Sequence, residues 1–281
     1  MADTQNEIYA QAYGQNIMQL AQQKYSKLLP TVYLKPNVRG KTFFQDQIGE
    51  WAMETKGGRN VATPNNDPAL ARRMGVMLDY HDNRMLDRGD ELKTISDPRS
   101  AYTIAAARSL GRKIDDVIIA AAVSITTASG ETGSTTAPTT ATLAITTGSL
   151  YIQDVTRFKK ALDDADVEEE DRYLIITPSL MQSGLNDEKL SSGDYAAIKA
   201  LVNGQINTFM GFKWIMSTRL SQQSGLEGLV YHKNAICLAM ATQPLVKTDE
   251  RSDLSYSWQI YYELNCGAVR LEESRIRKIR T

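Results

Sequence analysis

The sequence predicts a mixed α+β fold, and three stretches of the chain carry that prediction. From Asp97 to Val123, apolar residues recur at steps of three and four, which is typical of one long helix. A short apolar run over 173–177 indicates a buried strand. Nearer the C terminus, apolar and polar residues alternate without a break over 256–264, which is the strongest strand pattern in the chain.

The composition is that of an ordinary globular protein. The chain has 281 residues, of which 42% are hydrophobic and 23% charged, and its formal net charge is −1. This length suffices for one large domain or two smaller ones, and the charge argues against a general nucleic-acid or membrane-surface binder. The polar N terminus is unlike a signal peptide, and no apolar run approaches transmembrane length. Cys237 and Cys266 are predicted to be buried and reduced, with a disulfide as the minor alternative, so we expect folding in a cytoplasm.

The long helix is expected to begin after Asp97, a good N-cap, with Pro98 in its first turn. At 1.5 Å per residue it would span about 39 Å, so other parts of the chain or a neighbour must lie along it. We expect the late strands to cover its apolar face, which comprises Ile104, Ala107, Leu110, Ile114, Val117, Ile118 and Ala121. The polar side is expected to carry Arg108, Arg112, Lys113 and Asp115.

A second amphipathic helix is predicted over residues 5–29, ended by Pro30. Its apolar face would carry Ile17, Leu20, Ala21, Tyr25 and Leu28. The sequence leaves two interpretations open: a helix packed on its own domain, or an arm that docks on a partner subunit.

Residues 36–95 are predicted to form a long two-stranded excursion with a polar, turn-rich tip at 55–68. Its return limb alternates from Met74 to Tyr80. An isolated hairpin is marginally stable, so such an arm should lie on another surface. The mixed charges of the return limb suit an ion-paired protein interface better than phosphate binding, and a solvated surface is the alternative. The candidate intersubunit contacts are Arg72, Arg73, Asp79, Arg84, Asp87 and Arg88, with Tyr25 and Leu28 of the N-terminal segment.

The second half of the chain indicates a linker followed by an α/β region. Residues 124–149, rich in Thr, Ser, Ala and Gly, are expected to form a linker or surface loop. Beyond them we expect helices at 155–162, 180–185 and 195–202, and strands at 173–177, 211–216, 229–232 and 235–240. Gly267 is expected to permit a turn or bulge before apolar pieces at 269–271 and 276–279.

No catalytic or metal-binding pattern emerges from the sequence. His81 and His232 lie far apart without a partner at metal-ligand spacing, and no nucleophile elbow or dinucleotide fingerprint occurs. Adjacent acidic residues at 115–116 and 168–171 point to different faces, so we assign them to ion pairing and solvation. We therefore predict a protein that is not an enzyme and needs no cofactor or metal, with a site assembled from scattered residues as the alternative.

Four stretches, taken in order, resemble parts of one protein family. They are 106–121, 172–179, 203–220 and 232–238, and the alternating strand, Gly267 and a β ending follow them. Together they resemble the tailed-bacteriophage major capsid proteins with the Hong Kong 97 fold, over nearly the whole chain. The combination of a glycine, a Gly-Phe strand, Ser-x-Arg-Leu and His-Lys-x-Ala-Ile is fairly specific, although each piece alone is weak.

The resemblance implies an α+β Hong Kong 97-type fold with a defined order of parts. An N-terminal arm would occupy 1–35 and an extended β-hairpin loop 36–95. The long spine helix and the Thr/Ser-rich connection, at 96–149, would belong to a peripheral domain with a β-sheet. An α/β axial domain would take most of 150–240, and strands at 241–281 would return to the peripheral domain.

The resemblance also implies a function: self-assembly into the icosahedral head shell that encloses the phage genome. Implied partners are copies of the chain in hexameric and pentameric capsomers, a separate scaffolding protein, a portal and, as an optional partner, a decoration protein. Double-stranded DNA would be packaged inside without sequence-specific binding, and no membrane is involved. The protein would assemble in the host cytoplasm and reside in the virion. Some members of the family join a lysine on the extended loop to an asparagine of a neighbouring copy, with a nearby glutamate as base. Lys56 lies near the loop tip, but the sequence shows no matching asparagine and glutamate, so covalent cross-linking is not expected.

Two alternatives to a phage head shell remain open at this point. One is an encapsulin-like nanocompartment shell, which would share the fold. The other, less favoured, is an α/β enzyme with a swapped arm.

Overall fold

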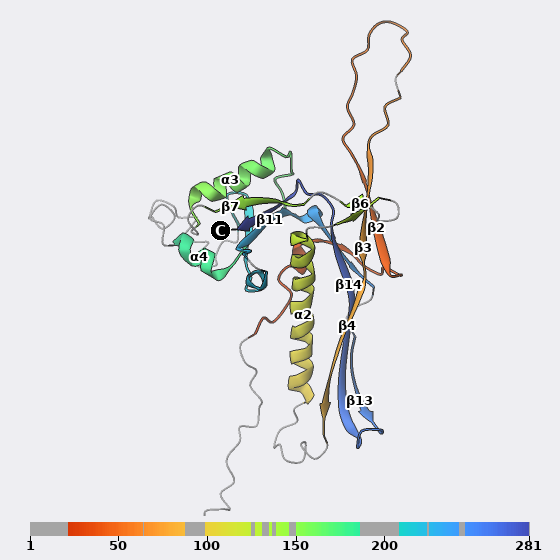
Figure 1. The fold of residues 1–281 in the computed structure, drawn as a ribbon, viewed down its shortest axis with the longest axis vertical. Coiled ribbons are helices and arrows are strands. Elements are labelled where there is room, and N and C mark those ends of the chain that lie inside the picture. Colours follow the sequence, from red (N-terminus) through yellow and green to blue (C-terminus); the bar gives the residue numbers. More distant parts are fainter. Residues whose placement is uncertain are drawn as a thin grey trace, which may run out of the picture.

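The computed structural model shows an elongated molecule with three parts (Figure 1). A compact lobe carries helices α3 and α4, a long helix and a long sheet extend away from it, and a hairpin projects in the opposite direction. The structure describes residues 22–63, 65–87, 99–124, 127–130, 135–136, 139–145, 150–185, 208–223, 225–241 and 245–280.

The predicted long helix is confirmed as α2 (Arg99–Val123), which packs against β14 (Ser257–Arg270) as expected. Leu110, Ile114 and Ile118 are buried in a core that the helix shares with both the long sheet and the lobe. The proposed cap at 97–98 lies outside the described residues. No helix in the described part of the chain is both long and apolar enough to span a bilayer.

The buried face of α2 differs in part from the predicted one. Ile104 is 50% exposed and Ala107 is exposed, so neither belongs to the core. Asp115, placed on the polar side by its charge, is instead 0% exposed. The prediction was wrong because the chain covers a second side of the helix, around Gly111 and Asp115, with its N-terminal segment.

Strand β14 is the centre of the long sheet. It pairs with β4 (Leu78–Leu86) along one edge and with β12 (Ile236–Met240) and β13 (Leu245–Arg251) along the other. Strand β1 (Tyr33–Lys35) adds to β12 in parallel. The predicted strand is confirmed from Ser257 onward, with Ile260 and Leu264 buried, whereas Tyr256 precedes the strand and is 55% exposed. Strand β13 was not predicted, because its charged residues do not show the pattern of a half-buried strand.

The turn or bulge expected at Gly267 is wrong, since β14 continues through it to Arg270. A glycine is needed at this position for a different reason. A Cβ added there would lie 2.1 Å from the carbonyl oxygen of Val76, so Gly267 lets the chain between β3 (Leu70–Val76) and β4 cross close to β14.

The hairpin sheet confirms the predicted two-stranded excursion. Strands β2 (Thr42–Ile48) and β3 pair antiparallel, and β5 (Ala128–Ser129) and β6 (Thr135–Thr136) extend the sheet beyond β3. The return limb leaves the hairpin at Met77, so β4 belongs to the long sheet. The expectation of a linker or surface loop over 124–149 is also wrong in part, because its described parts supply short strands to two sheets.

The lobe sheet has the strand order β7-β15-β11-β8-β10-β9. Its strands are β7 (Ala141–Ala144), β8 (Arg172–Ile176), β9 (Thr208–Phe209), β10 (Phe212–Met216), β11 (Gly228–His232) and β15 (Ile276–Arg280). Helices α3 (Ile152–Asp163) and α4 (Pro178–Leu185) flank it. Short 3-10 turns lie at Leu29–Thr31, Leu220–Gln222 and Lys233–Ala235.

Every residue of β8 is buried, because both faces of the lobe sheet are covered. Tyr173 and Ile175 point into the core shared with α2, whereas Leu174 and Ile176 point into the core under α3 and α4. This division follows from the alternation of side chains along a strand. The predicted strands at 173–177, 211–216, 229–232 and 235–240 and the helices at 155–162 and 180–185 are thereby confirmed.

Two predicted segments fall partly or wholly outside the described residues. The helix expected over 5–29 is described only from residue 22, and 22–28 are not helical. Pro30 lies within a 3-10 turn. The helix expected at 195–202 lies outside the described residues.

The sheets also cross the predicted boundary between 240 and 241. Strand β12, before the boundary, pairs with β14 in the long sheet. Strand β15, after it, pairs with β7 and β11 in the lobe sheet. The chain therefore passes between the two sheets more often than the linear order of parts suggests.

Replacing Gly267 by alanine tests the strand crossing. Because the added methyl would meet backbone rather than a movable side chain, we expect the free energy of unfolding to fall by about 1–3 kcal/mol. Gly57→Ala is the control, since a Cβ at Gly57 has no atom within 4 Å. Chemical denaturation of the purified protein measures both, and equal stability of the two variants would contradict the crossing.

Cys237 and Cys266 are both free and buried, as predicted. Burial raises the pKa of each thiol from 9.0 to about 11. Because the folded state disfavours the thiolate, this contribution to stability is complete below pH 9.0 and is lost as the pH rises towards about 11. We expect both thiols to resist an aromatic disulfide reagent at neutral pH until denaturant unfolds the chain. Rapid labelling of the folded protein would show that they are accessible.

Candidate assembly surfaces

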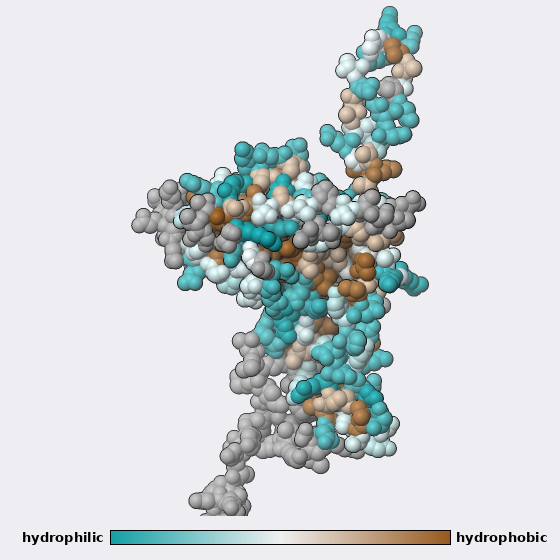
Figure 2. Space-filling model, viewed as in Figure 1, coloured by the Kyte–Doolittle hydropathy of each residue, from teal (hydrophilic) through white to brown (hydrophobic). Residues whose placement is uncertain are grey.

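The hairpin beyond β2 and β3 carries apolar side chains that the subunit itself does not cover. Residues 49–63 and 65–69 project away from the body, and Figure 2 shows apolar residues along this projection. The exposed fractions are 75% for Ile48, 71% for Trp51, 98% for Met53, 54% for Val61 and 79% for Leu70. Several such side chains on one projecting arm indicate a surface that another molecule covers.

The base of the hairpin packs tightly on the body. Phe43 is 3% exposed and shares a small core with Met77, Cys237 and Val269. Its ring lies against Gly75 of the paired strand, where an added Cβ would come within 2.2 Å of it. The hairpin is therefore seated on the long sheet at one end and unsupported by its own subunit at the other.

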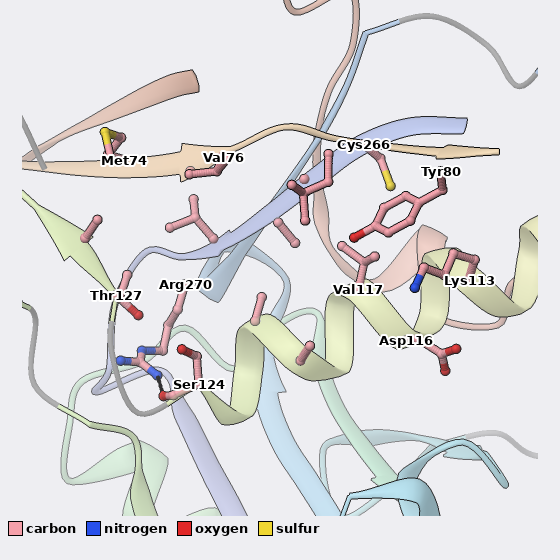
Figure 3. Close-up of a pocket in the computed structure, with 18 of the residues that line it drawn as sticks. Met74, Val76, Tyr80, Lys113, Asp116, Val117, Ser124, Thr127, Cys266 and Arg270 are labelled. Atoms are coloured by element: carbon pink, nitrogen blue, oxygen red, sulfur yellow. Dashed lines mark hydrogen bonds between the residues drawn. The ribbon is translucent and has the colours of Figure 1, made fainter. Parts of the chain in front are cut away.

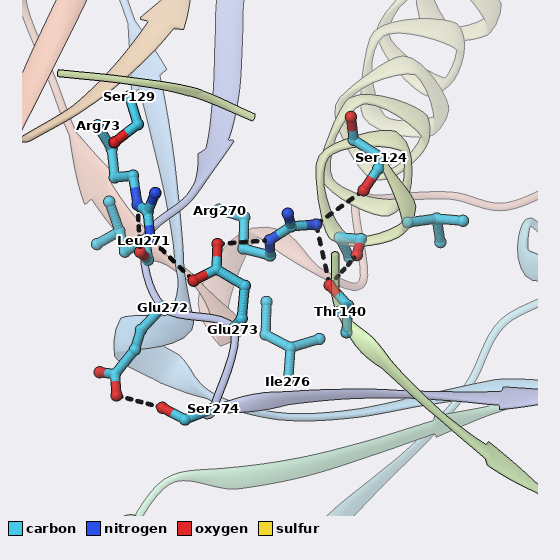
Figure 4. Close-up of polar contacts among 12 residues, drawn as sticks. Arg73, Ser124, Ser129, Thr140, Arg270, Leu271, Glu272, Glu273, Ser274 and Ile276 are labelled. Carbon is cyan, nitrogen blue, oxygen red and sulfur yellow. Dashed lines mark hydrogen bonds and ion pairs between the residues drawn. The ribbon is translucent and has the colours of Figure 1, made fainter. Parts of the chain in front are cut away.

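A polar cluster joins this base to the rest of the molecule (Figure 4). One carboxylate oxygen of Glu273 lies 2.8 Å from Nη2 of Arg73 in β3, and the other lies 3.2 Å from Nε of Arg270 in β14. Arg73 also donates from Nε to the carbonyl oxygen of Leu271, at 2.9 Å. The arrangement ties the hairpin, the end of β14 and the following turn together by charge-assisted hydrogen bonds.

Two buried cations cap the C terminus of α2. Arg270 donates from Nη1 to the carbonyl oxygen of Ser124 at 2.8 Å, and Lys278 of β15 donates to that of Val123 at 3.0 Å. Helix C termini carry partial negative charge and unsatisfied carbonyls, so cations stabilise them. Burial, helped by nearby Arg270 and Arg280, lowers the pKa of Lys278. Because the two cations come from different sheets, the helix end is the joint between those sheets.

The buried carboxylate of Asp115 holds the N-terminal segment against α2. It accepts hydrogen bonds from Gln23 Nε2 at 2.5 Å, Ser26 Oγ at 2.6 Å and the backbone N–H groups of Lys27 at 3.2 Å and Leu28 at 3.1 Å. Gly111, one turn earlier, lets this backbone approach, since an added Cβ would lie 2.9 Å from the nitrogen of Ser26. We call this arrangement the arm clasp.

An open groove of about 600 Å³ lies between the β3–β4 crossing and α2 (Figure 3). Val76 and Leu78, 41% and 52% exposed, form one wall, and Val117 lies on the opposite wall. Lys113 stands at one end with its ammonium 4.2 Å from the centre of the Tyr80 ring. The groove is a concave, partly apolar surface immediately beside the hairpin base.

The structure places the predicted contact residues in two environments. Leu28 is fully buried in the core with α2, and Arg73 is held in the polar cluster at the hairpin base. Their contacts within the chain account for both side chains, and their intersubunit role stays a prediction.

The other predicted contact residues that the structure describes lie at the surface. Arg72 pairs with Asp46 at 2.5 Å, and this hydrogen bond is the main reason that the pKa of Asp46 is lowered. The guanidinium of Arg84 lies 5.8 Å from the ring centre of Tyr102. Tyr25, Asp79 and Asp87 are exposed, Asp79 accepts a hydrogen bond from Asn265, and Arg88 lies outside the described residues.

His232 and its neighbours make structural hydrogen bonds and ion pairs within the lobe. Its ring is buried, Nδ1 accepts from the N–H of Asn234 at 3.2 Å, and burial lowers its pKa. Glu168 lies beside it and bonds to Arg275 at 2.5 Å. Among the described residues, no group of three or more His, Cys, Asp or Glu side chains is arranged to hold a metal ion.

Sequence reasoning missed Asp115, Arg270 and Glu273 as organising residues. A glycine one turn before an aspartate, as in Gly111 and Asp115, was an available signal, because both then lie on one side of a helix. For Arg73 and Glu273 no local signal exists, since 200 positions separate them.

Comparison with known proteins decides the family. The family model described as phage capsid protein matches residues 6–281. The chain belongs to the phage capsid protein family. Among curated proteins, no sequence matches it.

Solved capsid structures share the fold of this capsid protein at low sequence identity. The capsid structure of the cyanophage P-SCSP1u is 15% identical, with a TM-score of 0.78 over 98% of this chain and 93% of that one. The capsid of Helicobacter pylori bacteriophage KHP30 is 10% identical, with a TM-score of 0.74 over 99% and 97%. The capsid of Ralstonia phage GP4 is 9% identical, with a TM-score of 0.72 over 100% of this chain and 97% of that one.

The predicted resemblance to phage capsid proteins is confirmed, and the mixed α+β architecture matches capsid folds. The protein is thus a structural component of a phage shell.

Replacing Asp115 by asparagine tests the arm clasp. The amide has one acceptor oxygen for donors that now share a carboxylate, so we expect a loss of about 1–3 kcal/mol in stability. Trypsin should then cut faster after Lys24 and Lys27, which lie in the clasped segment.

Asp116→Asn is the matched control on the same helix. Asp116 pairs with Arg219 and, among the described residues, makes no hydrogen bond to the N-terminal segment, so its loss should leave cleavage after Lys27 unchanged. Equal cleavage rates in both variants would contradict the clasp.

Proposed function

We propose that this chain is the major capsid protein that self-assembles into an icosahedral head shell enclosing the phage genome. The observation that carries the proposal is a subunit incomplete by itself. It projects a hairpin with uncovered apolar side chains and has an open, partly apolar groove beside the base of that hairpin. Repetition of one subunit around symmetry axes covers such surfaces and closes a shell.

The fold supports a Hong Kong 97-type assignment of parts. Helix α2 would be the spine, the hairpin of β2 and β3 the extended loop, the lobe sheet the axial domain and the long sheet the peripheral domain. The five predicted segments are kept, but strands are reassigned with their sheets. Strands β1, β4 and β12 go to the peripheral domain, and β7 and β15 go to the axial domain.

The partners follow from this role. Copies of the chain would form hexameric and pentameric capsomers, assembled in the host cytoplasm with a separate scaffolding protein and a portal, with a decoration protein optional. Double-stranded DNA would lie inside without sequence-specific contacts, which is compatible with a net charge of −1. The half-buried Arg72 and the exposed Arg84 and Asp87 on the return limb, with the exposed Tyr25 beside the arm clasp, are the preferred candidates for intersubunit contacts.

Electron microscopy of purified protein, combined with a hairpin variant, tests the proposal. Wild-type protein is expected to give closed shells or capsomer rings. The double variant Trp51→Ser, Met53→Ser should remain folded but lose shells, because each covered side chain contributes about 1.5–3 kcal/mol at every copy of the interface.

Lys56→Ser on the same projection is the control and should assemble normally. Circular dichroism of all three proteins separates misfolding from loss of assembly. A small discrete oligomer in the wild type would overturn the proposal, and normal shells from the double variant would remove the hairpin from the interface. Shells lacking DNA in phage-infected cells would favour the nanocompartment alternative.

A further inference from the structure

We propose that Glu273 is a latch that sets the direction in which the hairpin of β2 and β3 projects. The latch consists of Arg73 on the hairpin, Glu273 in the turn before β15, and Arg270 at the end of β14 (Figure 4). Its effect on the hairpin of a single subunit does not depend on the proposed shell. The consequence of the latch for shell assembly rests on the proposed function.

The moving end of the latch is Arg73, in the middle of β3. Its Nη2 meets Glu273 at 2.8 Å and its Nε meets the carbonyl oxygen of Leu271 at 2.9 Å, so the guanidinium is held along two of its edges. The two charged side chains are only 11% and 16% exposed, which limits screening by solvent and salt. A small rotation of the hairpin would break both contacts at once.

The fixed end is Arg270, which is 0% exposed. Its Nη1 donates to the carbonyl oxygen of Ser124 at 2.8 Å and to Oγ1 of Thr140 at 2.9 Å. Thr140 in turn donates to the carbonyl oxygen of Ala122 at 3.2 Å. Arg270 therefore cannot follow the hairpin, because it is held by the C-terminal end of α2.

The charges make Glu273 the indispensable member. One carboxylate lies between two guanidinium groups and uses a different oxygen for each. Without its charge, two buried or nearly buried cations would face each other across a neutral side chain, which is unfavourable at low solvent exposure. Since Arg270 is fixed, the repulsion between the two cations is relieved most easily when the hairpin moves away from Arg270.

The other polar attachments of the hairpin that the structure describes lie near its base. Strand β3 pairs with β5 at one register position, Arg73 with Ser129, and the carbonyl oxygen of Arg72 accepts from the N–H of Gly130 at 3.0 Å. Lys35 donates to the carbonyl oxygen of Phe44 at 2.8 Å. Phe43 and Gly75 seat the base on the small apolar core, and such non-directional contacts tolerate rotation better than a charged hydrogen bond does. The direction of the hairpin should therefore follow the state of the latch.

Distance measurement between two nitroxide labels tests the latch. Labels are placed at Ile48→Cys, an exposed position at the end of β2, and Ala107→Cys, an exposed position on α2. The native cysteines are buried and should not be labelled. Excess unlabelled protein restricts the measured distance to pairs within one subunit.

We expect Glu273→Gln to shift or broaden the distance distribution relative to the labelled parent. Glu272→Gln is the matched control, because the neighbouring carboxylate bonds to Arg275 at 2.5 Å and is not part of the latch. It should reproduce the parent distribution. A distribution for folded Glu273→Gln that superimposes on the parent would overturn the inference.

Arg73→Gln keeps the test decisive if Glu273→Gln does not fold. It removes the latch residue of the hairpin and leaves the Arg270–Glu273 pair in place. Because the hairpin loses its charged tether, a broadened distribution is expected, and a parent-like distribution would again overturn the latch. Shell formation is scored separately by electron microscopy. Altered distances with normal shells would uphold the latch and separate it from assembly, whereas absent shells in the wild type would count against the proposed function alone.

Discussion

Helix α2 must be covered on several sides, and this requirement organises the rest of the chain. At 1.5 Å per residue its 25 residues span about 38 Å. The long sheet packs along one side, the N-terminal segment lies on another at Gly111 and Asp115, and the lobe core meets its C-terminal half. Three parts of the molecule that do not otherwise form one layer are held in a common frame because each packs on the same helix.

Apolar packing and buried charge have different tasks in this frame. Within each layer the contacts are apolar, as in the two cores on either side of β8. At the junctions the chain places ionised groups: Asp115 under the N-terminal segment, Arg270 and Lys278 at the helix end, and Glu273 at the hairpin base. Apolar surfaces accept small shifts, whereas a buried charge requires particular partners at particular distances. The geometry of the junctions is therefore fixed more precisely than the packing within the layers that they join.

The same distinction explains what could be predicted from the sequence. The helix from 99 to 123, the strand at 172–176 and the alternation along β14 were predictable, because one-dimensional periodicity reports which side of an element is buried. Asp115 was misplaced because the periodicity of apolar residues cannot show that a carboxylate is buried against donors from another segment. The hairpin was predicted, but the pairing of Arg73 with Glu273 was not, because it joins residues that no local pattern relates. Strand β13 was missed for a third reason: its partner β14 supplies the alternation, and its own residues are those of a charged edge.

The position of β15 ties completion of the lobe to the progress of translation. This strand comes after every other described strand, yet it lies between β7 and β11 and contributes to both cores through Ile276 and Ile279. A nascent chain that lacks residues 276–280 has a lobe sheet with a missing interior strand, and it also lacks Lys278 at the end of α2. Ribosomes add about 5–20 residues per second, so earlier segments wait many seconds for that strand. A prematurely terminated chain should therefore expose apolar surface that chaperones and proteases recognise, and this would remove defective copies.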